Sequence, residues 1–134
     1  MATGAREYQT RQVHYLYRDV TIADTSGTQY SMGKIPANAV VIGTTVGVTT
    51  VFNATTTNVL IVGTSGDDDA LVAAAGVDET AVAVTRVAPA TLAGRLSTTA
   101  EVEVFTKFTQ SGTAATTGAA WVVVEYAVPD TSRN

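Results

Sequence analysis

The chain has 134 residues and a net charge of −4; 46% of its residues are hydrophobic, 15% are charged, one is histidine and none is cysteine. That length suits one domain with a sizeable core, and the residue counts exclude disulfides, thiolate chemistry and metal sites built from several histidines or cysteines. The low charge content predicts that part of the surface is buried against other chains, while the acidic balance argues against nucleic-acid binding, which needs clustered lysine and arginine.

The N-terminal segment is interpreted as an arm that leads into a strand. Residues 1–12 are polar and have no sustained period, which predicts a segment that is mobile unless something holds it. Residues 13–22 then alternate, with Tyr15 and Tyr17 on one side of a predicted strand. The first 18 residues carry three arginines against one glutamate, whereas the remainder is acidic. Two interpretations of the tyrosines stay open here, an ordinary amphipathic strand and a surface that contacts another protein.

Most of the remaining chain is predicted to form β-strands. The clearest signal is the long alternating run that follows Ile35 and Pro36, in which β-branched residues repeat with period 2. Its glycines, Gly43 and Gly47, predict a bend or bulge. Turn residues separate this run from shorter ones. The predicted strands cover residues 13–22, 28–32, 40–52, 58–62, 80–87, 91–97, 100–109 and 119–128.

One segment after the fourth predicted strand departs from this pattern. Asp67 is suited to cap a short helix over Asp68–Ala75, because acidic side chains favour a helix N-terminus and Gly76 is a natural stop. The alternative is calcium binding by the three consecutive aspartates, whose carboxylates are hard oxygen ligands. Consecutive residues cannot all point at one ion and the EF-hand spacing is absent, so the helix cap is the preferred interpretation.

Candidate reactive residues do not form a recognisable site in the sequence. Glu101 and Glu103 share one face of a predicted strand, which is typical of a solvated face as well as of an acid pair. His14 lies beside tyrosines and is interpreted as a packing or interface residue. The segment 63–66 lacks the Gly-Lys-Ser/Thr ending of a phosphate-binding loop. We therefore predict no catalytic residue, no cofactor, no metal site and no small-molecule substrate, and we expect that the protein is not an enzyme.

Together these segments predict an all-β fold, an antiparallel β-sandwich or jelly-roll-like barrel of about eight strands with one short helix. The lack of a strand–helix–strand rhythm excludes a parallel nucleotide-binding sheet. In the last strand the face with Trp121 and Val123 is apolar enough to predict cover on both sides. No apolar run reaches the roughly 18–20 residues of a membrane span and the N-terminus lacks the apolar core of a signal peptide, so we expect a cytosol-like environment and no membrane.

Four segments give the chain a resemblance to a known group of proteins. They are Lys34–Gly43, Val51–Asn53, Val62–Asp67 and Trp121–Tyr126, which read KIPANAVVIG, VFN, VGTSGD and WVVVEY. In this order they resemble small structural proteins of tailed bacteriophages, which are decoration or cement proteins of the capsid or belong to related parts of the virion. The similarity covers residues 20–128 and contains no catalytic signature.

The resemblance implies a small β-sandwich, often a homotrimer, that binds at junctions between major capsid protein subunits on the capsid exterior and stabilises the head. Such a virion protein is made in the host cytoplasm. The predicted organisation is an N-terminal arm with the first strand (1–18), a β-sandwich body (19–129) and a short tail (130–134). Because the arm is the only basic segment on an acidic body, it is the candidate for capsid or neighbour contacts. The candidate contact residues are Arg6, Tyr8, Arg11, Tyr15 and Tyr17.

The alternative is a receptor- or carbohydrate-binding β-sandwich of a phage fibre or another virion component. Such sites need exposed aromatic and polar groups that converge on loops. Trp121, in contrast, lies within a predicted strand, and the loops are rich in threonine, glycine and alanine. The sequence therefore favours the decoration protein.

Overall fold

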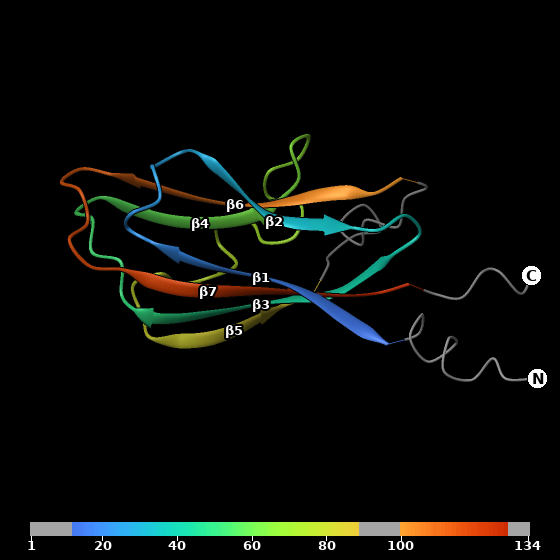
Figure 1. Cartoon of the computed structure of the whole chain (residues 1–134). Helices are drawn as coiled ribbons and strands as arrows, with labels where there is room; N and C mark the ends of the chain where they lie inside the picture. The colour runs from blue at the N-terminus through green and yellow to red at the C-terminus, as the bar shows by residue number, and fades with distance from the viewer. Residues whose placement is uncertain (1–11, 89–99, 129–134) are drawn as a thin grey trace, which may run out of the picture.

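The computed structural model describes residues 12–88 and 100–128, which form two antiparallel β-sheets packed face to face (Figure 1). Sheet A has the strand order β1-β7-β3-β5, and sheet B has the order β2-β6-β4. The predicted all-β sandwich is therefore confirmed. The strands within the described residues are β1 (Val13–Thr21), β2 (Gln29–Ile35), β3 (Val40–Thr50), β4 (Thr57–Gly63), β5 (Ala83–Val87), β6 (Val102–Ser111) and β7 (Ala119–Ala127).

The odd-numbered strands form sheet A and the even-numbered strands form sheet B, so successive strands of the described chain alternate between the two sheets. The first and last strands are neighbours: Val13 lies opposite Ala127 and Thr21 lies opposite Ala119. The described chain consequently begins and ends at the same end of sheet A (Figure 1). Pairing of strands this distant in sequence is a tertiary property that no local pattern specifies.

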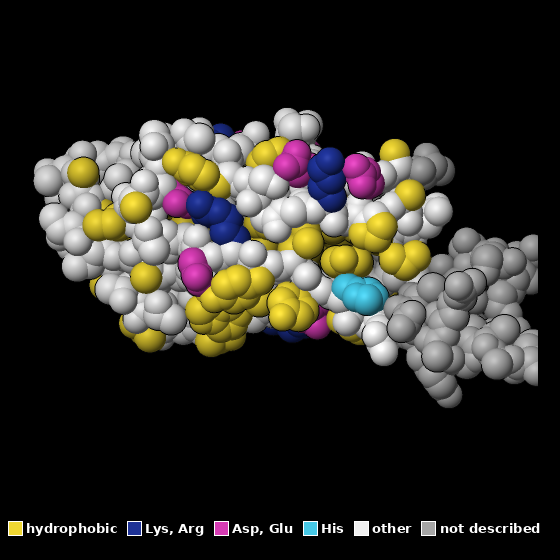
Figure 2. All heavy atoms as spheres, viewed as in Figure 1, with side chains coloured by type: hydrophobic (Ala, Val, Ile, Leu, Met, Phe, Trp, Pro, Cys, Tyr) yellow, Lys and Arg dark blue, Asp and Glu magenta, His cyan; other side chains and the backbone are white. Residues whose placement is uncertain are grey.

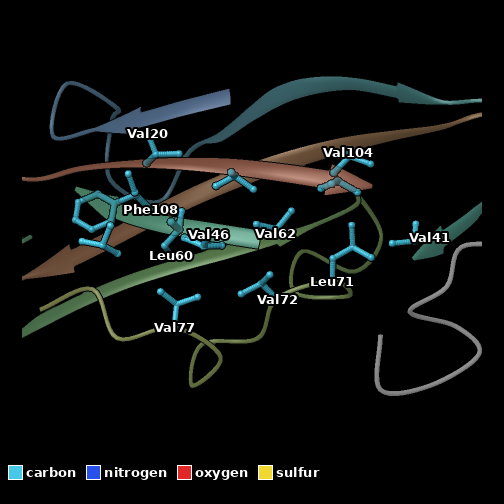
Figure 3. Close-up of a cluster of buried hydrophobic side chains, with 14 of the residues drawn as sticks. Val20, Val41, Val46, Leu60, Val62, Leu71, Val72, Val77, Val104 and Phe108 are labelled. Carbon is cyan, nitrogen blue, oxygen red and sulfur yellow. The ribbon is translucent and has the colours of Figure 1, made fainter. Parts of the chain in front are cut away.

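The core lies between the sheets and is built from the inward-facing half of each strand. In β7, for example, Val122 and Val124 are completely buried, while Val123 between them faces outward. The rings of Phe52 and Phe108 meet with their centroids 4.7 Å apart and join the end of β3 to β6. Burial of each such aliphatic or aromatic side chain contributes about 1.5–3 kcal/mol. Figure 3 labels Val20, Val41, Val46, Leu60, Val62, Leu71, Val72, Val77, Val104 and Phe108 in this layer.

Strand β3 is the long central strand that the alternating run predicts, and it lies between β7 and β5. Its register with β7 shifts between Val41 and Gly43, so the bulge predicted near Gly43 is confirmed. A second shift lies between Val48 and Thr50. The bulges let an eleven-residue strand follow the twist of its neighbours.

The predicted helix over Asp68–Ala75 is wrong, because this segment consists of turns. The carbonyl of Asp67 accepts hydrogen bonds from the amides of Thr64 and Ala70, at 2.8 and 3.3 Å. Leu71 and Val72 then extend along the outer edge of β4 and bond the backbone of Val62 at 2.9–3.1 Å. A helix of two turns is marginal by itself, and pairing with an open sheet edge together with burial of Leu71 and Val72 outweighs it.

Glu79, which also lies in the connection between β4 and β5, satisfies a further backbone amide on the edge of β4. Its carboxylate accepts a hydrogen bond from the amide of Leu60 at 2.7 Å, and its carbonyl accepts one from the amide of Phe52 at 2.9 Å. Glu79 is only 5% exposed, and this burial raises the pKa of its carboxyl above the ordinary value. An edge amide that would otherwise be buried without a partner is thereby satisfied.

The jelly-roll form of the prediction, with about eight strands, is not confirmed. Seven strands lie in the described part of the chain, and the strand predicted over 91–97 falls outside it. An isolated antiparallel bridge between Val62 of β4 and Val72 lies at the position where a further strand of sheet B would pair with β4. Across residues 12–88 and 100–128, no helix has the length and apolar character needed to cross a membrane.

Candidate interaction surface

The acidic residues that could have formed a catalytic pair face solvent on sheet B. Lys34 forms an ion pair with Glu101 at 3.3 Å, and the Ser31 hydroxyl donates to Glu103 at 2.6 Å. Lys34 and Glu101 are 57% and 61% exposed. These contacts are those of a solvated strand face, as the sequence favours.

The three consecutive aspartates form an exposed turn, where one carboxylate oxygen from each lies within 4.8 Å of the others. The pKa of Asp69 is raised. The main cause is a side-chain hydrogen bond with Asp67, and desolvation and the neighbouring negative charges add to it. Lys107 reaches the cluster from β6 and donates to Asp68 at 2.8 Å. Because this segment is not helical, the prediction that Asp67 caps a helix is also wrong. The carbonyl of Asp67 instead accepts the hydrogen bonds that form a turn.

Arg18, the last basic residue of the predicted arm, makes contacts within the chain that join the two sheets. Its guanidinium holds the Asp24 carboxylate with two hydrogen bonds of 2.6 and 3.0 Å and donates to the buried hydroxyl of Thr106 at 3.1 Å. It also lies 4.6 Å from the centre of the Tyr30 ring. Arg18 therefore links β1 of sheet A to β2 and β6 of sheet B and is a structural residue.

The outer face of sheet A is apolar and exposed. It begins on β1, where Tyr15 and Tyr17 are 66% and 49% exposed, and it ends on β5, where Val84 is 67% exposed. Across the described residues, the exposed large hydrophobic side chains all lie on the outer side of this sheet or at its rim. They are Val13, Tyr15, Tyr17, Ile42, Val82 and Val84.

Small residues on β3 shape the middle of this face. Trp121 of β7 lies against Gly47, its partner across the sheet, where a Cβ atom would overlap the indole ring. Arg86 of β5 crosses Gly43 in the same way and forms an ion pair with Glu125 of β7. At Gly47 a side chain would displace the Trp121 ring, whereas at Gly43 it would meet the end of the flexible, half-exposed Arg86 side chain. The glycines therefore let Trp121 and Arg86 lie close to the backbone of β3.

Figure 2 shows the sandwich from its edge. A cluster of hydrophobic side chains lies over sheet A near the cyan side chain of His14, and a group of neighbouring acidic and basic side chains lies over sheet B. The charges on sheet B pair across its strands, as in Lys34 with Glu101. Monomeric proteins seldom expose a contiguous apolar patch of more than a few hundred Å², so the outer face of sheet A is the candidate interaction surface.

The structure describes two of the five predicted contact residues. Tyr15 and Tyr17 lie side by side on the outer face of β1, and the Tyr17 hydroxyl donates to Asp19 at 2.6 Å, which raises the pKa of that hydroxyl. Arg6, Tyr8 and Arg11 lie outside the described residues. Whether these residues make capsid or neighbour contacts stays a prediction.

Sequence reasoning missed the contribution of β5 to this surface. Val82 and Val84 are both 67% exposed. Ala83 and Val87 alternate with them and are also apolar, so the pattern does not indicate which of the two sets faces the core. His14, interpreted as a packing or interface residue, stacks on Tyr126 with ring centroids 5.7 Å apart.

Two solved structures are similar to this chain. One is a chain in the structure of the cyanophage Pam1 capsid asymmetric unit, with a TM-score of 0.66 and 21% sequence identity over 90% of this chain and 87% of that chain. The other is a chain in the structure of the capsid of Ralstonia phage GP4, with a TM-score of 0.57 and 19% identity over 90% of this chain and 86% of that chain. No protein-family model and no curated protein sequence matches the chain. The likeness is one of fold.

Proposed function

We propose that this protein is a structural component of a tailed-bacteriophage virion, which decorates the capsid exterior, bridges major capsid protein subunits and stabilises the head. The observation that carries this proposal is the fold, since 90% of the chain aligns with chains from two phage capsid structures. The ordered sequence segments that resemble decoration proteins support the same function independently.

The chemistry of the described residues suits such a role. A packaged genome presses outward on its shell, so a protein that bridges subunits raises the free energy needed to separate them. That task requires a stable body and contact surface. The sandwich supplies a continuous core, and sheet A supplies an exposed apolar face. A homotrimer belongs to the proposal, because self-association would cover apolar surface on a chain with only 15% charged residues.

The N-terminal arm is proposed to make capsid or neighbour contacts through Arg6, Tyr8, Arg11, Tyr15 and Tyr17. Strand β1 begins at Val13, so the first twelve residues precede every described strand. An extended arm can add a strand to a neighbour's exposed sheet edge and gain main-chain hydrogen bonds without a deep pocket. Its basic residues are attracted to acidic partners, in contrast to the acidic body.

The test is cosedimentation of the purified protein with undecorated heads. We expect saturable binding and heads that survive higher temperature or lower salt. A variant without residues 1–12 should bind weakly or not at all, while its circular dichroism and melting temperature match those of the full chain. Full occupancy of heads by the truncated protein would refute the role of the arm. Absence of binding by the full chain, combined with competable binding on a glycan array, would favour the carbohydrate-binding alternative.

A further inference from the structure

We propose that the outer face of sheet A is the surface through which copies of this chain contact one another, with the β1 side of one copy packed against the β5 side of the next. This inference deepens the proposed function and rests on it for the expectation of self-association. Its starting point is the segregation of exposed apolar side chains: within the described residues, the large ones all lie on this face or its rim.

The apolar area is large enough for a contact between copies. A tyrosine side chain buries roughly 150–250 Å², and Tyr15 and Tyr17 are 66% and 49% exposed, so the two rings together offer roughly 200 Å². The exposed valines and Ile42 bring the face to on the order of 500 Å². Two such faces provide about 1,000 Å², which is the lower limit for a specific interface.

The distribution of charge favours a second copy as the occupant. The outer face of sheet A carries Asp19, Arg86 and Glu125, and the last two form an ion pair within the chain. Acidic residues that would repel a second acidic copy gather elsewhere, on the outer side of sheet B and in the aspartate turn. Contact through sheet A therefore keeps the acidic regions of two copies apart.

The two rims of the face complement each other. Strand β1 presents tyrosines and the acidic Asp19, whereas β5 presents valines and the basic Arg86, which is 51% exposed. When sheets pack around a symmetry axis that is parallel to their strands, opposite edges of neighbouring copies meet. The strand registers place Tyr17 level with Arg86, and Asp19 level with Val84. Around such an axis the Tyr17 ring of one copy therefore packs on Arg86 of the next, with Val84 two residues away, and Asp19 lies near enough to Arg86 to attract it. In a twofold pair the two faces lie over one another, whereas in a ring of three only their opposite edges meet.

The absence of cysteine makes the contact measurable by cross-linking. Tyr17→Cys and Val84→Cys, each purified separately and then mixed, should give a cross-linked species with a short bis-maleimide. The matched control replaces Tyr17→Cys with Thr57→Cys, which is exposed on the outer side of sheet B. We expect cross-linking in the first mixture and at least about tenfold less in the control. Equal yields in the two mixtures would overturn the assignment.

A charge substitution tests the same surface by another route. Val84→Asp should weaken self-association by about 30-fold or more, measured by native mass spectrometry and sedimentation, because the contact would bury a carboxylate without a partner. Thr57→Asp adds the same charge to the opposite sheet and should leave association unchanged. Circular dichroism and thermal unfolding establish that both variants fold. A wild-type chain that stays monomeric, or an oligomer that Val84→Asp does not disturb, would refute the inference.

Capsid binding separates this inference from the proposed function. If the wild-type chain associates through sheet A but does not bind heads, the self-contact stands and the capsid role fails. If the wild-type chain binds heads but Val84→Asp associates with itself as strongly as wild type does, the capsid role stands and the self-contact fails.

Discussion

The two outer faces of this sandwich are made by the same kind of strand and yet have opposite character. On sheet B, the outward positions of β6 include Glu103 and Lys107, the partly buried Val59, Ile61 and Phe105 lie beside them, and Lys34, Glu101 and Lys107 form ion pairs. On sheet A, tyrosine, tryptophan and valine occupy the outward positions, and β3 contributes glycine and threonine. Both sheets contribute to a single core. The difference shows that the inner faces account for folding, while the outer faces divide into a solvated side and a side suited to contact.

The largest effect is expected in the core that the two sheets share. Phe108→Ala should lower the free energy of unfolding by about 3–5 kcal/mol, because the ring is fully buried and packs against Phe52. Urea denaturation followed by circular dichroism measures this loss. Phe108→Leu keeps most of the apolar volume and should cost clearly less. A similar loss in both variants would mean that the stability does not depend on filling this volume.

The covered edge of β4 is tested through Glu79. Glu79→Ala removes the acceptor for the Leu60 amide and should cost about 1–3 kcal/mol of unfolding free energy. Glu79→Gln keeps an acceptor oxygen without the charge and serves as the matched control. If Glu79→Ala leaves the free energy of unfolding unchanged, water must satisfy the Leu60 amide in place of the Glu79 carboxylate.

The same residue predicts a pH dependence. Burial raises the pKa of Glu79 in the folded chain, so the folded state holds this proton more tightly than the unfolded state, whose pKa is about 4.3. The contribution of Glu79 to stability is therefore highest below that value and declines as pH rises through the folded pKa. Subtracting the Glu79→Gln curve from the wild-type curve should isolate this decline. A flat difference between the two curves would contradict it.

A moderate effect is expected at the centre of the apolar face. In Gly47→Ala the new methyl group would overlap the Trp121 indole, so the ring must swing away from β3. We expect a loss of about 1–2 kcal/mol in unfolding free energy and a red-shifted emission from this single tryptophan. Gly66→Ala adds a methyl group where no atom lies within 4 Å and is the control. An unshifted spectrum in Gly47→Ala would show that the backbone yields instead.

The smallest effect is expected on sheet B. Lys34→Ala breaks an ion pair in which both side chains are more than half exposed, and water screens such pairs, so the change in unfolding free energy should be about 0–1 kcal/mol and should shrink further in salt. Thermal unfolding at two salt concentrations measures it. A loss above 2 kcal/mol would mean that the charged face contributes to folding after all.

Much of the fold can be predicted from the sequence, because alternation in residues such as Val40–Phe52 and Val102–Phe108 directly reflects a pleated strand with one buried side. The aspartate-rich segment is where local reasoning fails. Its alanines and capping residues favour a helix, but Leu71 and Val72 pair with Val62, which comes from the preceding strand. Half of the candidate surface was also predictable: Tyr15 and Tyr17 stand out by composition, whereas Val82 and Val84 do not.

The sequence by itself determined an all-β chain, the approximate positions of its described strands and the bulge near Gly43. Only the tertiary structure decided which strands are neighbours and which apolar face of β7 remains on the outside. The physical reason is that alternation separates two faces of a strand but does not rank them when both are apolar, as they are around Val122 and Val123. The ranking comes from long-range pairing, which places sheet B against one side of sheet A and leaves Tyr15, Tyr17 and Val84 exposed on the other.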